Sequence, residues 1–450
     1  MKLHLSSLRA LIPILLLAFL ASCGGSGGSA LPSTDVPTSP PSGDTPLPVK
    51  VAPVISNLRY SPSATYMSAS PVVFAGTFDF ADPDGDLASA TLTVVELPSG
   101  ATIGLQTTPI ANAAGLTGGT VQGAVSALIA NAGVYSLQIF VTDLTGLRSN
   151  VLSGDVRISL FPWTQKLASP TAREFAAVAE LGGRIYVLGG QRTDTGVTPG
   201  PASAVVEIYN PVLNTWTPSP PMPTARMGLV AAAVNGKLYA IGGRTDGYST
   251  SATGAVEEFD PATQIWTTKS SMPTPRFFAA GAQVLDQEIY VAGGENGSTI
   301  LSTLERYTPM ANSWSTLPPM PTARSQLAAV GAKLPYVVGG YAGLQSQWVG
   351  TVEVFDPTGF GTWSVRNAMP TPRAHLALAE TNGKLFAAGG ENTSRALDTL
   401  ESFDLATNTW SVKTPSPVPF SRAAATGLNG RVYIFANSRT YEYDPANDLR

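Results

Sequence analysis

The sequence predicts an all-β protein built from two domains, and three features of the chain lead to this prediction. The 450 residues include 44 glycines and 37 prolines, whereas only 13% of the residues are charged. Such a composition is typical of many short strands joined by tight turns. Hydrophobic residues alternate with small or polar ones in several runs between residues 53 and 160, as in half-buried strands. From residue 161 onward a pattern repeats with a period of roughly fifty residues.

The first 22 residues have the features of a targeting segment. Lys2 and Arg9 provide positive charge, and the apolar stretch 10–20 is too short to span a bilayer. The segment ends on the run Leu20-Ala21-Ser22-Cys23, which resembles the lipobox of bacterial lipoproteins. This resemblance implies that residues 1–22 are a signal peptide, cleaved before Cys23, and that Cys23 carries the lipid. The alternative is an ordinary signal peptide with a chance cysteine, although Cys23 is the only cysteine in the chain.

Residues 23–52 consist mainly of Gly, Ser, Pro and Thr, with almost nothing to bury. This composition predicts a flexible tether between the lipid and the folded domains. Gly24 follows the cysteine, and similarity to lipoprotein sorting rules implies the outer membrane in a host that has one. We therefore expect a protein anchored in the cell envelope outside the cytoplasm, which contacts the membrane through its lipid alone.

Residues 53–160 are predicted to form a small β-sandwich. Alternating runs at 72–80, 90–97 and 134–142 indicate strands, and the turn signals Asp84-Gly85, Ser99-Gly100 and Thr145-Gly146 separate such runs. Short strands at this spacing without a helical period favour a sandwich. The stretch from Gly133-Val134-Tyr135 to Val141-Thr142-Asp143 and Gly146 resembles the late strands of bacterial immunoglobulin-like and PKD-like domains.

Acidic residues crowd one turn of this domain and suggest a calcium site. Calcium takes six to eight oxygen ligands, which alternate aspartates and backbone carbonyls can supply. The alternative is an acidic turn at the end of a strand, where Asp and Gly are favoured in any case. The candidate ligands are Asp79, Asp82, Asp84, Asp86 and Asp143.

The repeats of residues 161–450 predict a β-propeller. Each repeat contains four strand-like runs, which is the content of one propeller blade. Tryptophans recur at Trp163, Trp216, Trp266, Trp314, Trp363 and Trp410. Arginines recur at Arg173, Arg226, Arg276, Arg324, Arg373 and Arg422, ten residues after each tryptophan except the last, where the offset is twelve. Glycine pairs begin at Gly189, Gly242, Gly293, Gly339 and Gly389.

These signatures resemble the kelch repeat: a glycine pair, an aromatic residue before Asp-Pro or Asn-Pro, a tryptophan, and then Met-Pro-Thr-x-Arg. The resemblance covers residues 161–447 and implies a kelch-type propeller. Because the chain enters this region at the end of a repeat, we expect residues 161–167 to complete the blade begun by residues 423–445, which gives six blades. The pattern departs at Ala436-Asn437, which replaces a glycine pair, and at Leu405, which replaces a proline.

The repeated arginines are predicted to be structural. Five repeats also carry a glutamate at a matched place, namely Glu207, Glu257, Glu305, Glu353 and Glu401. An arginine and a glutamate that recur once per blade indicate a buried, charge-assisted contact between strands, for which the planar guanidinium suits better than an ammonium. The competing interpretation is a basic ring at a ligand site.

Candidate ligand-binding residues follow from the kelch resemblance. In ligand-binding kelch domains, contacts come from residues just after the glycine pair and just after the Pro-x-Arg segment. The first set here is Gln191, Arg244, Glu295, Tyr341 and Glu391, and the second is Glu174, Met227, Phe277, Ser325 and His375. Their mixture of aromatic, acidic and amide groups suits polar recognition. The alternative is that they are solvated loop tips.

These features favour a binding or interaction protein that uses the loop face of the propeller, with a protein or a glycan as ligand and no cofactor other than the candidate calcium. The formal net charge of −4 and the absence of a basic run give no electrostatic footprint for nucleic acid. Two alternatives remain. One is a cofactor-free sugar mutarotase or epimerase, like the sialic-acid mutarotases that resemble kelch propellers, with Arg244, Glu295, Glu391 and His375 as acid and base groups. The other is a structural spacer of the envelope.

Copper oxidation, the chemistry of galactose oxidase, does not fit the sequence. That site needs two histidines, two tyrosines and a cysteine joined to one tyrosine. After cleavage the chain retains one histidine, His375, and its cysteine is the expected lipid anchor. A zinc site of the usual composition fails for the same reason.

Overall fold

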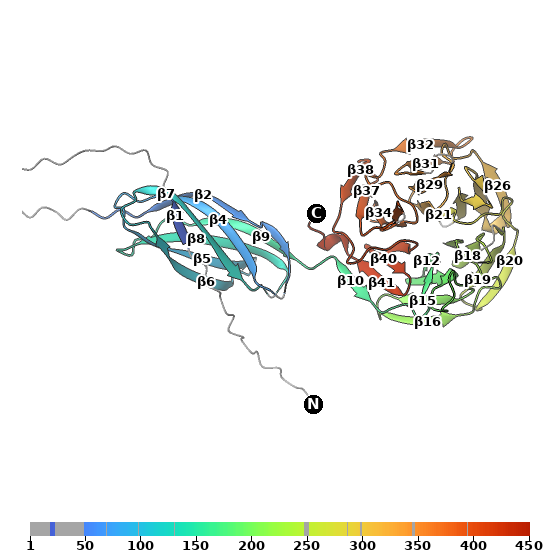
Figure 1. Ribbon diagram of the computed structural model, residues 1–450, viewed down its shortest axis with the longest axis horizontal. Helices are drawn as coiled ribbons and strands as arrows, with labels where there is room; N and C mark the ends of the chain where they lie inside the picture. The colour runs from blue at the N-terminus through green and yellow to red at the C-terminus, as the bar shows by residue number, and fades with distance from the viewer. Residues whose placement is uncertain are drawn as a thin grey trace, which may run out of the picture. The chain divides into compact units, whose positions relative to one another are not determined.

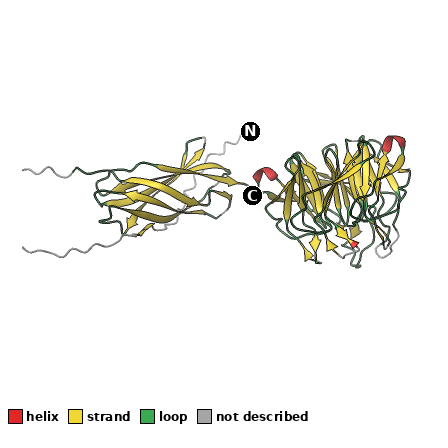
Figure 2. Cartoon of the chain, turned by 90° about the horizontal axis from the view of Figure 1, so that it is seen from above, coloured by secondary structure: helices red, strands yellow, loops and turns green. Residues whose placement is uncertain are grey.

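The computed structural model describes residues 19–22 and 49–450, except 69, 98, 130, 247–251, 286, 298, 344–346 and 394. The chain forms two compact units that divide between Phe161 and Pro162. Strands make up most of each unit, and only short helical turns accompany them (Figure 2). The all-β prediction is therefore confirmed. Within the described ranges, no helix is both long enough and apolar enough to cross a membrane.

The N-terminal unit is built from nine strands, whose order in the sheet is β2-β4-β7-β1-β6-β5-β8-β9-β3 (Figure 1). Their bounds are β1 (Phe19–Ser22), β2 (Val54–Ser61), β3 (Ala64–Tyr66), β4 (Val72–Ala81), β5 (Leu87–Leu97), β6 (Thr102–Ala111), β7 (Gly118–Ala127), β8 (Gly133–Asp143) and β9 (Leu152–Ser159). The runs predicted at 72–80, 90–97 and 134–142 correspond to β4, β5 and β8.

One hydrophobic core lies between the two halves of this sheet. Alternation along β4 buries Phe74, Phe78 and Phe80, and these rings share a cluster with Leu92 of β5 and Leu137 of β8. Because β4 and β5 lie in different halves of the strand order, the halves face each other across the shared core. The immunoglobulin-like identity of the unit remains a prediction.

Strand β1 lies inside the segment predicted to be a signal peptide. It pairs antiparallel with β7 and parallel with β6, and so joins the two halves of the sheet. Cleavage before Cys23 would remove this strand and leave the facing edges of β6 and β7 without it. Cys23 itself and the predicted tether up to residue 48 lie outside the described residues.

The C-terminal unit contains six four-stranded antiparallel sheets among the described residues, arranged around a central axis (Figure 1). In order, they are β12 (Ala177–Leu181), β13 (Arg184–Leu188), β15 (Val206–Asn210), β16 (Thr215–Ser219); β17 (Val230–Val234), β18 (Lys237–Ile241), β19 (Val256–Asp260), β20 (Ile265–Lys269); β21 (Ala280–Val284), β22 (Glu288–Ala292), β25 (Leu304–Thr308), β26 (Ser313–Leu317); β27 (Ala328–Gly331), β28 (Pro335–Val338), β31 (Val352–Asp356), β32 (Thr362–Arg366); β33 (Ala377–Thr381), β34 (Lys384–Ala388), β37 (Leu400–Asp404), β38 (Thr409–Val412); and β39 (Ala424–Leu428), β40 (Arg431–Ala436), β41 (Arg439–Tyr443), β10 (Trp163–Lys166). We call them blades 1 to 6.

Blade 6 is assembled from both ends of the unit. Its outer strand, β10, pairs antiparallel with β41, so that Trp163 lies opposite Tyr443. This pairing closes the ring of blades. Short two-strand pairs project beyond the blades: β11 (Arg173–Glu174) with β14 (Gln191–Arg192), β23 (Glu295–Asn296) with β24 (Thr299–Ile300), β29 (Tyr341–Ala342) with β30 (Gln347–Trp348), and β35 (Glu391–Asn392) with β36 (Arg395–Ala396). The described residues also include two 3-10 turns, η1 (Pro309–Ala311) and η3 (Pro445–Asn447).

The repeated tryptophans and glycines hold neighbouring blades together. Each tryptophan of the outer strands donates its indole N–H to a backbone carbonyl of the preceding blade, as Trp363 does to Pro318 at 2.8 Å. The first glycine of each pair lies against the backbone of the following blade. A Cβ on Gly189, whose φ is +62°, would stand 2.5 Å from the carbonyl oxygen of Arg226. Only glycine tolerates that combination of dihedral angle and close approach.

Five of the six repeated arginines form the predicted buried ion pairs. The pairs are Arg173–Glu207, Arg226–Glu257, Arg276–Glu305, Arg324–Glu353 and Arg373–Glu401, with N···O distances of 2.6–2.8 Å and arginine side chains at most 1% exposed. Burial lowers the pKa of Arg276 to about 10, since desolvation outweighs the attraction of Glu305. The basic-ring interpretation is excluded for these five residues.

The prediction was wrong for the sixth arginine. Phe420, ten residues after Trp410, takes the arginine position of blade 6, because its carbonyl accepts the N–H of Gly390 as the carbonyl of Arg373 accepts that of Gly340. Tyr441 takes the place of the glutamate, and both rings lie in one apolar cluster. Arg422 is two residues further along and exposed. Blade 6 thus replaces the ion pair by apolar packing.

Candidate binding site at the mouth of the propeller channel

The six blades meet at one end of the channel in a closed ring of backbone hydrogen bonds. One residue from each blade donates its N–H to the carbonyl of its neighbour at 2.9–3.0 Å, and the sixth bond returns to the first residue. All six have positive φ angles of 49–61°. The ring residues are Phe175, Gly228, Phe278, Gln326, His375 and Arg422. We call them the mouth ring.

Positive φ is uncommon outside glycine, yet five of these six residues carry side chains. Left-handed backbone costs roughly 1–2 kcal/mol per residue, and such strain persists where the surrounding structure enforces it, often at functional sites. Here the cyclic hydrogen bonds enforce it. The consequence is that five side chains from five blades border one cavity of about 110 Å³.

Aromatic rings occupy much of this mouth. Phe175 and Phe278 lie 4.9 Å apart between centroids, and the His375 ring meets both edge-on, at 5.1 and 5.4 Å. Two guanidiniums cover the phenyl rings, Arg422 over Phe175 at 5.2 Å and Arg244 over Phe278 at 5.4 Å. Cation–π contacts of this kind stabilise charge next to apolar surface.

Acidic side chains balance the charges of the mouth. Arg422 lies 3.1 Å from Glu174 and 3.7 Å from Glu391, and the Nδ1 of His375 lies 2.9 Å from a carboxylate oxygen of Glu391. The hydrogen bond with His375 lowers the pKa of Glu391, and the positive charge of Arg422 lowers it further. The Nε2 of His375 is buried, and no residue that the structure describes forms a hydrogen bond with it.

A second charged pair lies beside this group. Arg244 also stacks on Phe277, at 5.1 Å, and Glu295 interacts with it electrostatically. Burial lowers the pKa of Arg244 and raises that of Glu295, because both charges lose solvent here.

The two predicted sets of ligand residues are neighbours in space. Backbone bridges join Met227 to Arg244, Phe277 to Glu295 and Ser325 to Tyr341, while Glu174 pairs with Gln191 in β11–β14. Positions after the glycine pair and after the arginine therefore gather at the same end of the propeller. Among the predicted residues, His375 is a member of the mouth ring. Four others contact ring members, namely Glu174, Arg244, Phe277 and Glu391.

Three other predicted residues are buried or packed against neighbouring side chains, which makes them less accessible to a ligand. Ser325 is fully buried, and Gln191 is 7% exposed with its amide donating to the carbonyl of Gly200. Tyr341 stacks edge-on against Trp348, at 5.9 Å. Sequence reasoning missed Phe175, Phe278, Gln326 and Arg422. For Phe175, Phe278, Gln326 and the predicted His375, the signal in the sequence is the position two residues after a buried arginine. Arg422 instead lies two residues after Phe420, so this signal does not reach it.

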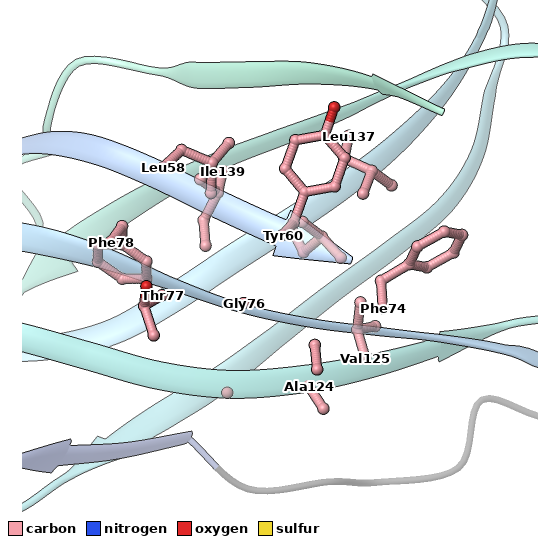
Figure 3. A pocket seen from close by; sticks show the side chains of 13 residues that line it. Leu58, Tyr60, Phe74, Gly76, Thr77, Phe78, Ala124, Val125, Leu137 and Ile139 are labelled. Carbon is pink, nitrogen blue, oxygen red and sulfur yellow. The ribbon is translucent and has the colours of Figure 1, made fainter. Parts of the chain in front are cut away.

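Two other cavities lie outside the mouth ring. The channel itself, about 370 Å³, is lined by the innermost strands of the six blades. Most of its lining residues are Ala, Gly or Val, and Glu180, Gln283 and Glu380 add charged or amide side chains. In the N-terminal unit, a cavity of about 40 Å³ lies among Leu58, Phe74, Val125 and their apolar neighbours (Figure 3). That volume suits about one water molecule.

The predicted calcium ligands divide into two groups. Asp79 is satisfied by Thr120 at 2.6 Å and Asn57 at 2.8 Å. Asp82, Asp84 and Asp86 lie in the turn that connects β4 with β5, and Asp143 is the last residue of β8. Within the described part of the chain, no three His, Cys, Asp or Glu side chains are arranged as a ready-made metal-binding group.

Comparison with protein families identifies the repeats. Residues 154–340 match the KLHDC2/KLHL20/DRC7 Kelch-repeats domain, and residues 336–370 and 372–417 match the Kelch motif. The C-terminal unit is a kelch-repeat β-propeller. The kelch matches end at residue 417, and blade 6 beyond it has lost both the glycine pair and the buried arginine.

Curated kelch-like proteins are also similar to this chain. Kelch-like protein terF of Aspergillus terreus is 31% identical over 251 residues, which are 52% of this chain and 54% of that protein. Kelch-like protein 25 of Xenopus tropicalis is 27% identical over 54% of this chain and 32% of its own length, and human Kelch-like protein 23 is 28% identical over 49% and 38%. The chain thus spans about half or less of these relatives. The solved structure of YjhT shares the fold, with a TM-score of 0.52 and 15% identity, over 62% of this chain and 95% of that one.

Proposed function

We propose that this chain is a lipid-anchored, extracytoplasmic binding protein whose kelch propeller recognises a protein partner at the mouth ring. The observation that carries the proposal is the contrast between repeated and variable positions. The repeated arginines and glutamates are buried in the blades. The mouth ring instead displays side chains of different chemistry at equivalent backbone positions.

The dimensions of the site favour a macromolecular partner. Pockets that enclose small ligands commonly have about 300–1,000 Å³, whereas the cavity at the mouth has about 110 Å³. A partner that covers the mouth with a loop or chain end fits this shape better than a ligand taken inside. Similarity to kelch-like proteins supports an interaction function for the propeller. The lipobox-like sequence supports the anchor, and a glycan remains the alternative ligand.

Partner capture from envelope extracts tests the proposal with matched variants. Phe278→Ala and Arg422→Ala remove an aromatic and a charged group from the mouth ring. Phe360→Ala is the control, since Phe360 is fully exposed in the β31–β32 turn at the opposite end of blade 4. We expect a protein that binds the wild type and Phe360→Ala but loses at least tenfold in affinity for both mouth variants. A partner that binds both mouth variants as tightly as the wild type refutes the assignment of the binding site to the mouth ring.

One observation favours the mutarotase or epimerase alternative. His375 and Glu391 form a hydrogen-bonded pair, and the Nε2 of His375 has no partner among the described groups. A pair of this kind can exchange protons with a ligand. NMR exchange spectroscopy of sugar anomers tests it: catalysed exchange lost in His375→Ala supports an enzyme, and uncatalysed rates exclude that activity. An envelope spacer predicts neither a partner nor exchange.

A further inference from the structure

The turn between β4 and β5 holds buried aspartate oxygens that have no partner among the described residues, and we propose that it binds a calcium ion together with Asp143. Asp82 is 0% exposed, and within the described part of the chain neither of its carboxylate oxygens accepts a hydrogen bond. One oxygen of Asp86 and one of Asp143 are also buried, and neither has a hydrogen-bond partner in the described ranges.

The backbone brings these three residues together although Asp143 is far away in sequence. The carbonyl of Asp82 accepts the N–H of Gly85 at 3.1 Å, which folds residues 82–85 into a tight turn. The carbonyl of Asp86 accepts the N–H of Leu144 at 2.9 Å, and Leu87 pairs with Asp143 across β5 and β8. The orphaned carboxylates therefore belong to one small region of the fold.

A buried carboxylate without a partner is costly. The free energy of taking an isolated carboxylate out of water is several kcal/mol even after relaxation, and buried charges are normally paired or bound to metal. By contrast, the other carboxylate oxygen of Asp143 accepts three hydrogen bonds. They come from the N–H groups of Thr145 and Leu147 and from the Thr145 hydroxyl. No group in the described part of the chain donates a hydrogen bond to the Asp82 carboxylate.

A cation already lies at the edge of the turn. The ammonium of Lys50 is 2.8 Å from the second oxygen of Asp86, and Asp84 and Asp143 also attract it. Lys50 is 42% exposed, and among the described residues the Asp82 carboxylate accepts no hydrogen bond from it. With Lys50 bound to Asp86, the carboxylates are not gathered around one centre. Calcium binding would release Lys50 and let the side chains turn toward a common ion.

The donor set indicates the type of metal. Aspartate oxygens and backbone carbonyls suit hard cations, and calcium accepts irregular geometry at 2.3–2.6 Å, whereas magnesium demands a near-ideal octahedron. Zinc would require histidine or cysteine ligands. Asp79 is not part of the site, because Thr120 and Asn57 satisfy its carboxylate.

Calorimetry on the whole chain tests this proposal with three variants. All seven tryptophans lie at or beyond Trp163, so tryptophan fluorescence reports unfolding of the propeller and serves as an internal control. We expect CaCl2 to raise the melting temperature of the calorimetric transition of the N-terminal unit by several degrees, with no shift in the transition followed by tryptophan. In isothermal titrations, Asp82→Asn should lose at least tenfold in calcium affinity because it lacks a ligand carboxylate. Asp79→Asn should bind calcium like the wild type, since Asp79 is outside the site. Lys50→Met should bind calcium more tightly, because no ammonium competes for Asp86.

The behaviour without metal provides a second readout that does not depend on measuring affinity. In EDTA, Asp82→Asn should melt at a higher temperature than the wild type, because it removes an unpaired buried charge. In calcium, the wild type should instead melt at a higher temperature than Asp82→Asn. The proposal is overturned if millimolar calcium binds neither the wild type nor Lys50→Met. Equal calcium affinity of Asp82→Asn and the wild type, or a preference for magnesium, would overturn it as well.

Discussion

Replacement of Arg324 by methionine should destabilise the propeller strongly. The Arg324 side chain is 0% exposed, and one of its terminal nitrogens lies 2.7 Å from Glu353. The other donates to the carbonyls of Gly339 at 2.7 Å and Thr351 at 3.0 Å. Methionine has a similar length but no donors. The variant would leave Glu353, itself 1% exposed, with one carboxylate oxygen unpaired.

The magnitude follows from that uncompensated charge. Removing one partner of a buried ion pair costs about 3–5 kcal/mol. In urea, with a denaturant dependence near 3 kcal/mol/M, this corresponds to a midpoint lower by roughly 1–1.7 M. Removing both partners should cost much less, because a well-packed apolar pair can replace a buried ion pair. Blade 6 already does so with Phe420 and Tyr441.

Urea unfolding followed by tryptophan fluorescence measures this difference. The variants are Arg324→Met, Glu353→Leu and the double variant, and Lys384→Met is a control for an exposed charge pair with Asp404. We expect the double variant to recover at least half of the loss seen in Arg324→Met. The reasoning is refuted if Arg324→Met costs less than about 1 kcal/mol, the range of an exposed pair, or if the double variant is no more stable than the single one.

Three further predictions concern other parts of the propeller. Gly189→Ala should lower the urea midpoint markedly, because its Cβ would stand 2.5 Å from the carbonyl of Arg226 at a φ of +62°; an unchanged midpoint contradicts the close approach. Trp163→Ala should cost about 3–5 kcal/mol, since Trp163 is 5% exposed in the strand that closes the ring, and limited proteolysis should then cut near that strand first. The contribution of Glu391 to stability is fully present above its ordinary pKa of 4.5 and is lost as the pH falls through its lowered folded pKa. Unfolding free energies of the wild type and Glu391→Gln should therefore converge as the pH drops from 6 to 3; a constant difference contradicts this account.

The sequence allowed the propeller to be predicted because its signals are periodic. Trp363 and Arg373, and their counterparts in other repeats, perform one structural task per blade, so their spacing reveals the fold. The same logic predicted the buried ion pairs in five blades. It failed at Arg422, where the offset of twelve residues after Trp410 marked a different position; the residue ten after Trp410 is Phe420.

The mouth ring was harder to predict because its members share a backbone conformation and not a residue type. Phe175, Gly228 and Gln326 all have positive φ, yet nothing in their chemistry links them. Their common cause is the cyclic hydrogen bonding between blades. In the N-terminal unit, alternation along β4 revealed the strand, but the orphaned carboxylate of Asp82 became apparent only from its burial.

Site-specific photo-crosslinking tests the central claim most directly. A photoreactive side chain at Gln326, within the mouth ring, is compared with the same side chain at Phe360 at the opposite end of blade 4. Incubation with the envelope fraction should yield a protein adduct from position 326 and none from position 360. Adducts of the same protein from both positions, or from position 360 alone, would contradict a binding site at the mouth of the channel.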